Sequence, residues 1–346
     1  MTARVLVARL DNAGDVLLAG PCVRAVAARA GAVTLLVGPR GRAAADLLPG
    51  VHQVIEWCAP WIDPEPPALT GEAVDSLVRQ VSAARPDAAL ILTSFHQSPL
   101  PLALLLRLAG VPWIGAISPD YPGSLLDLRH RVDGDPPEPE RALSLARAAG
   151  FPAPGDGGRL AVRRPLPETG DLTGEPGYVA VHPGASVPAR QPSASRWAGH
   201  VRALAAAGYR VVVTGAPAER RLTAQVAMDN ARDLGGRTDL PELAAVLDRA
   251  SAVVAPNTGP AHLAAAVGTP VVSLFAPVVP AARWAPYGVP TVLLGNQDAA
   301  CRDSRARDCP VPGHPCLESV TPGQVLAAVG QLSTGGHRNR RTGGVS

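Results

Sequence analysis

Two series of short apolar runs, with a helix-like stretch between successive runs, constrain the fold of this chain most strongly. In the first series, runs of Val, Ile and Leu alternate with Ala-rich stretches. Continuous apolar runs are typical of strands covered on both faces, and the helices between them favour parallel pairing. The predicted strands are 5–10, 33–37, 53–57, 88–93 and 113–117, and the predicted helices are 15–30, 42–48, 72–84 and 100–108.

A Gly- and Pro-rich stretch separates this series from a second one. After a helical segment at 140–149, residues 155–177 hold many Gly, Pro and charged residues with little periodicity. Such a stretch indicates an interdomain linker. The second series predicts strands at 178–182, 209–215, 252–255, 271–275 and 291–294, and helices at 194–207, 218–231, 239–250, 258–267 and 322–332.

The predicted fold class is α/β, with two doubly wound Rossmann-like domains that face a central cleft. The 346 residues exceed what one hydrophobic core usually serves. Ligands of such domains bind at the carboxyl ends of the strands, so we expect them in the cleft. The predicted parts are an N-terminal domain at 1–165, a linker at 166–177, a C-terminal domain at 178–332 and a disordered tail at 333–346. The last helix is a candidate to pack back on the N-terminal domain.

The composition excludes several classes of function. The chain contains no Lys, so all 32 of its Lys or Arg positions are Arg, and Schiff-base chemistry and a P-loop lysine are excluded. The formal net charge is +3 and the sequence has no basic stripe with interleaved aromatics, which argues against a nucleic-acid partner. We find no transmembrane pattern and no signal peptide in the sequence, so we expect a cytoplasmic protein.

The five cysteines are an odd number and do not indicate a disulfide scaffold. Cys301, Cys309 and Cys316 share one segment with His314. Their spacing is not the C-x₂-C pattern of zinc sites. We interpret the segment as a structural loop, and a disulfide or a metal site stays open as an alternative.

The segment from Ala255 to His262 is the most informative candidate site. It leads from a predicted strand into a helix, which Asn257 or Thr258 can cap. Gly259 lets a ligand approach the backbone, and a helix N-terminus attracts phosphate. The ring of His262 lies one turn further on. The alternative is an ordinary capped helix with a half-buried histidine.

Two more candidate segments follow predicted strands. His182-Pro-Gly-Ala-Ser186 ends the first strand of the second series, and Arg190 follows it. The hydroxyl of Ser186 and the guanidinium of Arg190 suit a diphosphate, although a plain turn with a surface Arg fits as well. In Leu10-Asp-Asn-Ala-Gly-Asp15, Asp15 is either a general base or an N-cap carboxylate.

Together these segments resemble the heptosyltransferase family of bacterial glycosyltransferases, glycosyltransferase family nine. The resemblance covers roughly residues 4–330 and includes Gly215-Ala-Pro-Ala-Glu219 and Gly236-Arg-Thr-Asp-Leu240. It implies the two-domain GT-B architecture, with acceptor binding in the N-terminal domain and nucleotide-sugar binding in the C-terminal one. It also implies inverting transfer from a nucleotide-heptose, usually ADP-heptose, without a metal or other cofactor.

The resemblance assigns roles to individual residues. Asp15 matches the general base of the family. It implies that Arg190, Thr258, Gly259 and His262 bind the donor diphosphate, and that Asn257, Glu219 and Thr238 bind the donor sugar and nucleoside. The hydroxyl of Ser186 adds this residue to the predicted diphosphate site. Two positions depart from the family pattern: Asn257 replaces an Asp, which removes a charge beside the donor, and Arg190 replaces a Lys and keeps the charge.

We expect the acceptor to be a hydroxyl on a glycan or a small metabolite. His96, Arg129 and His130 are candidates to contact an acidic acceptor, although solvated or structural polar residues fit these positions as well. Two rival functions stay open. One is a nucleotide-sugar epimerase on the same architecture, and the other is a catalytically inactive sugar-nucleotide-binding protein, which Asn257 suggests.

Overall fold

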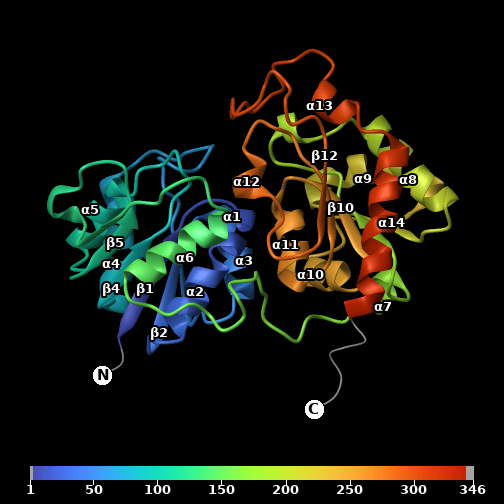
Figure 1. Ribbon diagram of the computed structural model, residues 1–346. Coiled ribbons are helices and arrows are strands. Elements are labelled where there is room, and N and C mark those ends of the chain that lie inside the picture. The colour runs from blue at the N-terminus through green and yellow to red at the C-terminus, as the bar shows by residue number, and fades with distance from the viewer. Residues whose placement is uncertain (1–2, 340–346) are drawn as a thin grey trace. The chain divides into compact units, whose positions relative to one another are not determined.

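The structure is a computed structural model that describes residues 3–339, and its contacts divide the chain into two compact units (Figure 1). The first unit ends at Arg163 and the second begins at Arg164. Each unit consists of one six-stranded sheet between two layers of helices.

The strands of the first unit pair in the order β3-β2-β1-β4-β5-β6, and all of the pairs are parallel. Val5 pairs with Val33 on one side and with Ala88 on the other, so β1 lies at the centre of the sheet. The sheet comprises β1 (Arg4–Arg9), β2 (Ala32–Val37), β3 (Gln53–Glu56), β4 (Ala88–Ile91), β5 (Ile114–Ile117) and β6 (Leu128–His130).

Helices cover both faces of this sheet. One layer contains α1 (Ala13–Leu18), α2 (Gly20–Ala27), α3 (Arg42–Leu47) and α6 (Glu138–Ala148), with the short η1 (Pro39–Gly41) beside α1. Helix α6 lies along α2 (Figure 1). The other layer contains α4 (Gly71–Ala84) and α5 (Leu100–Leu108), and the short η2 (Gly123–Leu125) packs on α5.

The second unit repeats the same topology. Its strands pair in the order β12-β11-β10-β7-β8-β9, again all parallel. Read from the other edge, this is the 3-2-1-4-5-6 order of dinucleotide-binding folds, which the first unit also has. The sheet comprises β7 (Val179–Val181), β8 (Val211–Gly215), β9 (Arg232–Gly235), β10 (Ala252–Pro256), β11 (Val271–Leu274) and β12 (Thr291–Leu294).

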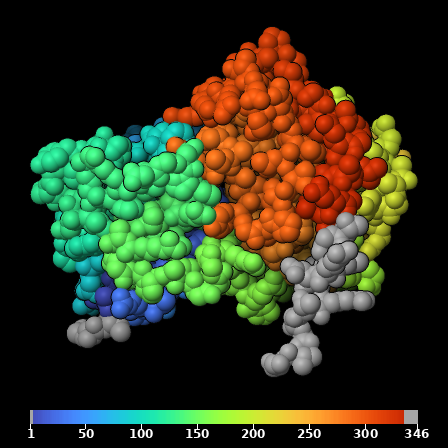
Figure 2. Space-filling view, in the orientation of Figure 1, coloured from blue at the N-terminus to red at the C-terminus, as the bar shows by residue number. Residues whose placement is uncertain are grey.

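The helices of the second unit form two layers as well. Helices α8 (Ala194–Ala206), α9 (Arg220–Ala227) and α14 (Pro322–Asn339) pack together, and α10 (Leu240–Asp248) packs on α11 (Gly259–Val267). The C-terminal segments, coloured orange to red, form much of the visible face of this unit (Figure 2). The shorter helices are α7 (Gly170–Thr173), α12 (Ala281–Trp284), α13 (Pro315–Glu318), η3 (Pro188–Arg190), η4 (Pro217–Glu219) and η5 (Met228–Asn230).

Aliphatic side chains build both cores. The strands of the first unit bury Leu6, Leu36 and Ile91 against the helix α5, and those of the second unit bury Val181 and Val213 with α8. Because these strands are covered on both faces, their runs of Val and Leu are almost fully buried.

The two doubly wound α/β domains of the predicted fold class are confirmed, and the structure differs from the sequence prediction at several places. The helix predicted at 15–30 is broken into α1 and α2, because Pro21 lacks the N–H that a continuous helix needs. The strands β6 and β9 were not predicted: β6 is short and half-buried, and β9 begins with charged residues. Helix α14 continues to Asn339 although residues 333–339 include no large apolar residue. The rest of the predicted tail, 340–346, lies outside the described residues.

Candidate active site

The strand order reverses at two points, between β1 and β4 in the first unit and between β7 and β10 in the second. Ligands of doubly wound sheets bind beside the carboxyl ends of the strands at such a reversal. Asp11 follows β1 and Asp15 lies in the first turn of α1, whereas His182 follows β7 and Asn257 follows β10. The residues predicted from the three motifs therefore lie at these two points.

In the first unit, the guanidinium of Arg9 contacts three carboxylates from different segments. Nη2 lies 3.0 Å from Asp15 Oδ1, Nε lies 2.9 Å from Asp11 Oδ2, and Nη1 lies 3.6 Å from Glu138 Oε2. Nη2 also donates to Ser94 Oγ at 2.9 Å. Arg9 is only 3% exposed. The four residues around Arg9 are called the Arg9 cluster below.

The electrostatics of the Arg9 cluster follow from its burial. Burial opposes the charge of Arg9, but the carboxylates of Asp11, Asp15 and Glu138 outweigh it and raise the pKa of Arg9 above its usual value. For Asp11, burial has the larger effect and raises the pKa, whereas the positive charge of Arg9 acts to lower it. A second cation, Arg141, lies 3.6 Å from Glu138. The cluster thus holds charged groups that are kept away from solvent by the fold.

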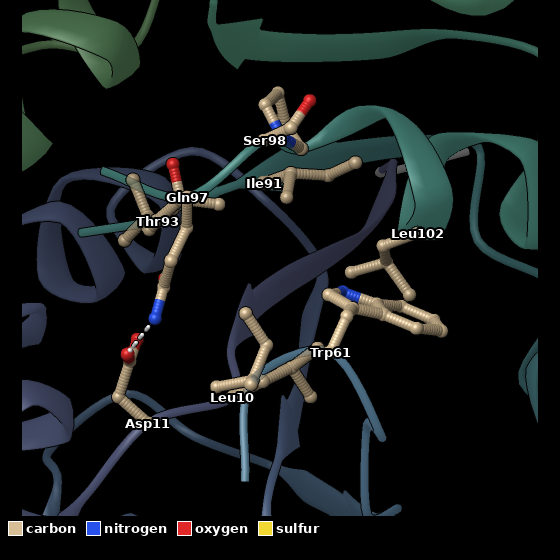
Figure 3. Close-up of a pocket in the computed structure, with 11 residues that line it drawn as sticks. Leu10, Asp11, Trp61, Ile91, Thr93, Gln97, Ser98 and Leu102 are labelled. Carbon is tan, nitrogen blue, oxygen red and sulfur yellow. Dashed lines mark hydrogen bonds between the residues drawn. The ribbon is translucent and has the colours of Figure 1, made fainter. Parts of the chain in front are cut away.

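A small pocket adjoins the Arg9 cluster at the carboxyl ends of β1 and β4 (Figure 3). The side chain of Gln97 points across to Asp11, and its Nε2 donates to Asp11 Oδ1 at 2.6 Å. Leu10, Trp61 and Leu102 form the apolar side. Asp11 therefore has an amide partner as well as a guanidinium partner.

The three residues predicted on the acceptor side do not form one group. His96 is exposed and precedes Gln97, which hydrogen-bonds to Asp11 of the Arg9 cluster. Arg129 Nε donates to the backbone oxygen of Ser118 at 3.1 Å. His130 Nε2 lies 3.0 Å from Ser144 Oγ, and burial followed by the charge of Arg141 lowers the pKa of His130.

In the second unit, the His182–Gly184 turn lies against Glu219. His182 is buried with Nδ1 3.0 Å from Thr214 Oγ1 and Nε2 3.6 Å from Glu219 Oε2. Burial lowers the pKa of His182, against the opposing effect of Glu219. Glu219 also accepts from the Ala216 N–H at 2.7 Å. A Cβ on Gly184 would lie 1.9 Å from Glu219 Oε1, so the turn leaves no room for a side chain there.

The start of α11 brings together Asn257, His262 and Arg190. Asn257 is 3% exposed, and neither Oδ1 nor Nδ2 has a hydrogen-bond partner. Arg190 Nη1 donates to the backbone oxygen of Asn257 at 3.5 Å. Burial and then the charge of Arg190 lower the pKa of His262 to about 4. Thr258 is the N-cap residue of α11, but the predicted capping bond from a side chain is not formed, so its hydroxyl is not used by the helix.

The remaining predicted donor residues are more peripheral. Ser186 is exposed in the loop before η3. Thr238 is half-buried and follows Gly236, whose oxygen accepts from Arg220 Nη2 at 3.1 Å. Gly259 opens α11. The structure therefore brings Arg190, Asn257 and His262 together most closely.

Residues distant in sequence hold the loop that carries Arg190. The N–H of Ala189 donates to the Arg307 oxygen at 2.9 Å, and the Ala189 oxygen accepts from His314 Nε2 at 3.0 Å. Both backbone polar groups of the residue before Arg190 are thus bonded to the segment 299–316. Sequence reasoning missed this clamp, which joins residues 125 positions apart.

The cysteines of that segment are free thiols. Cys301 and Cys316 are buried in the core of the second unit, and the half-buried Cys309 packs against it. Burial and then the neighbouring thiols raise the pKa of Cys316 to about 12. Among the residues whose side chains the structure describes, no group of three or more His, Cys, Asp or Glu is arranged to hold a metal ion. Apolar packing of these cysteines and the bonds of Ala189 to Arg307 and His314 hold the segment on the second unit.

Comparison with known proteins identifies the family. The family model described as glycosyltransferase family 9 (heptosyltransferase) matches residues 74–314. The chain belongs to glycosyltransferase family 9. The resemblance inferred from the sequence motifs is confirmed by this match, which extends from α4 to the segment 299–316.

Relatives of this family 9 chain include two curated proteins. Lipopolysaccharide heptosyltransferase 3 of Escherichia coli is 29% identical over 161 residues, which are 45% of this chain and 46% of that protein. Lipopolysaccharide core heptosyltransferase OpsX of Haemophilus influenzae is 42% identical over 55 residues, 16% of each chain. In these matches the chain spans at most about half the length of its relatives.

Solved structures of family 9 proteins share the fold over nearly the whole chain. A glycosyl transferase family 9 protein of Veillonella parvula has a TM-score of 0.76 at 17% identity and covers 96% of this chain and 97% of its own. The ADP-heptose lipopolysaccharide heptosyltransferase II of Escherichia coli has a TM-score of 0.73 at 20% identity, with coverages of 96% and 99%. The family 9 chain thus has the GT-B architecture. Among the described residues, no helix is long and apolar enough to span a membrane.

Proposed function

We propose that this protein is an inverting glycosyltransferase that moves a heptose-type sugar from a nucleotide diphosphate donor to an acceptor hydroxyl. ADP-heptose is the proposed donor, and a glycan or small metabolite is the proposed acceptor. Support comes from the family and from the relatives, which are named as lipopolysaccharide heptosyltransferases. The observation that carries the proposal is the pair of sites at the two strand-order reversals, one rich in carboxylates and one built on a helix N-terminus.

The second unit supplies the donor site. The first N–H groups of α11 and the guanidinium of Arg190 suit the negative charge of a diphosphate. Asn257 is the most informative residue, because a buried amide without a partner is costly unless a ligand satisfies it. A donor hydroxyl or phosphate oxygen would do so.

The other donor residues have defined roles in this proposal. Glu219 accepts hydrogen bonds from the ribose hydroxyls, and the backbone near Thr238 faces the nucleobase. Thr258, Gly259, Ser186 and His262 contact the diphosphate. His262 has a pKa of about 4 because it is buried, so at neutral pH it acts as a neutral hydrogen-bonding group.

The first unit supplies the general base, Asp15. Its carboxylate takes the proton from the acceptor hydroxyl while that oxygen bonds to the anomeric carbon of the donor. The bond from the anomeric carbon to the diphosphate oxygen breaks on the opposite face, so the configuration inverts. A positioned base contributes typically about 10²–10⁴-fold to the rate, and fixed cations and dipoles that face the departing diphosphate contribute the larger part. The proposal includes no metal, and it places the reaction in the cytoplasm, where sugar nucleotides are made.

Calorimetric titration of the protein with ADP, UDP, GDP and dTDP tests the donor assignment. ADP should bind most tightly, and Arg190→Ala should weaken ADP binding by about tenfold or more, as expected for the loss of a charge-assisted hydrogen bond. Arg202→Ala, which removes an exposed Arg of α8, is the matched control. Preference for another nucleotide would overturn the assignment of ADP-heptose as the donor. Binding of none of the four nucleotides would overturn the proposed function.

A further inference from the structure

We infer that Arg9 is a positioning residue for Asp15, and that it holds the Asp15 carboxylate in a single orientation toward the acceptor hydroxyl. This role rests on the proposed function, in which Asp15 is the base. The two side chains meet through Arg9 Nη2 and Asp15 Oδ1 at 3.0 Å. Arg9 ends the central strand β1 and Asp15 lies in the first turn of α1, so two packed elements fix both ends of the contact.

The geometry of the guanidinium makes this contact specific. A planar fork with donors in fixed directions defines where each acceptor must lie. The same Nη2 donates to Ser94 Oγ at 2.9 Å. Nε lies 2.9 Å from Asp11 Oδ2, where the two form an ion pair without hydrogen-bond geometry. A rotation of Arg9 away from Asp15 would therefore break the hydrogen bond to Ser94, which follows β4, and the ion pair with Asp11 in the β1–α1 loop. Burial strengthens each contact, because water does not screen it.

The two other carboxylates matter when Asp15 takes up a proton. A buried cation that loses its only carboxylate is strongly unfavourable. Arg9 retains Asp11 at 2.9 Å and Glu138 at 3.6 Å when Asp15 becomes neutral. Arg141, which lies 3.6 Å from Glu138, balances part of the negative charge of the cluster. The Arg9 cluster can therefore accept a proton on Asp15 without leaving a buried charge uncompensated.

A kinetic experiment separates positioning from a general effect on folding. The variants are Arg9→Met, Arg9→Lys and, as a matched control, Arg24→Met, which removes another Arg–carboxylate pair of the same unit, Arg24 Nη2–Asp156 Oδ2 at 2.8 Å. The rate is measured as release of ADP from ADP-heptose with water as the acceptor probe. ADP binding by each variant is measured by calorimetry.

The expected pattern is a loss of kcat without a loss of donor binding. Arg9→Met should lower kcat by about tenfold to a hundredfold, while its donor KM and ADP affinity stay within about twofold of wild type. Arg9→Lys should recover part of the rate, because it keeps the charge and loses the fork. Arg24→Met should leave kcat within about twofold. Equal kcat for Arg9→Met and wild type, or equal losses for Arg9→Met and Arg24→Met, would overturn the inference.

A double-mutant cycle tests the same pair without turnover. The Tm is measured for Arg9→Met, Asp15→Asn and the double variant. We expect the decrease in Tm of the double variant to be smaller than the sum of the decreases of the two single variants, because each single change leaves a buried charged partner without its counterpart. Strictly additive losses would overturn the inference. If the two side chains are coupled but the protein binds no nucleotide, the proposed function is overturned. The role of Arg9 in positioning a catalytic base is then overturned as well.

Discussion

The carboxylate of Glu219 lies directly against Gly184, so close that a Cβ on residue 184 would fall 1.9 Å from Oε1. The turn after β7 and the start of η4 thus approach each other where a donor ribose is proposed to bind. Gly184 is needed for the contact between two segments rather than for a left-handed backbone, since its φ is not in that region.

Gly184→Ala should therefore displace Glu219 and weaken ADP binding. Overpacking of this kind costs about 1–3 kcal/mol, and we expect the Kd for ADP to rise by about tenfold. Gly71→Ala is the control, because nothing lies within 4 Å of a Cβ at that position. An ADP affinity of Gly184→Ala equal to that of the control would show that Glu219 does not contribute to donor binding.

His314→Ala should weaken donor binding through the loop that carries Arg190. The change removes the bond from His314 Nε2 to the Ala189 oxygen, which contributes about 1 kcal/mol, so the Kd for ADP should rise by roughly fivefold. Calorimetry measures this change. In an Arg190→Ala background the same change should have little further effect, because both act on one contact. Full additivity of the two losses would contradict the clamp.

Stability should fall as the pH decreases from about 6.5 to about 4. Burial lowers the pKa of His262 and of His200 from 6.5 to about 4. In the unfolded chain these rings take up protons near pH 6.5, whereas the folded rings do so only near pH 4, so the unfolded state binds more protons in this window and is favoured there. One pKa unit corresponds to about 1.4 kcal/mol, which makes about 3 kcal/mol an upper value for each ring.

His200→Leu isolates one of these two contributions. His200 is buried in α8 beside Trp197, with Arg196 and Glu318 as the charged groups that act on it. Denaturant unfolding at a series of pH values should show a shallower loss of stability for His200→Leu than for wild type. The same slope in both proteins would mean that this ring does not titrate differently in the two states.

Sequence reasoning could identify the fold because its parallel strands are buried on both faces and remain visible as apolar runs, as in Val211–Gly215. It could also place Asp15, Arg190 and Asn257, which follow such runs. The strand β9 was missed because Arg232 and Asp233 interrupt the apolar pattern with charge. Local patterns record burial well where a strand is apolar, and poorly where its edge is polar.

The Arg9 cluster could not be predicted, because it depends on contacts between distant segments. Arg9 ends a run that is interpreted as an ordinary strand, and its partner Ser94 lies 85 positions away. Glu138 lies in the Pro- and Asp-rich residues 133–139, just before the helix predicted at 140–149, yet it begins α6 and is buried. Such contacts follow from the strand order, which the sequence pattern does not specify.

The most direct test of the proposed function is a product analysis of ADP-heptose incubated with the protein and a mixture of envelope glycans. Nuclear magnetic resonance of the products should show ADP and an equal amount of new glycosidic bond with inverted anomeric configuration, and Asp15→Asn should slow both by about 10²–10⁴-fold. Isomerised donor without ADP release would instead indicate an epimerase. Donor that is bound but unchanged would indicate a binding protein, and either result would contradict the account.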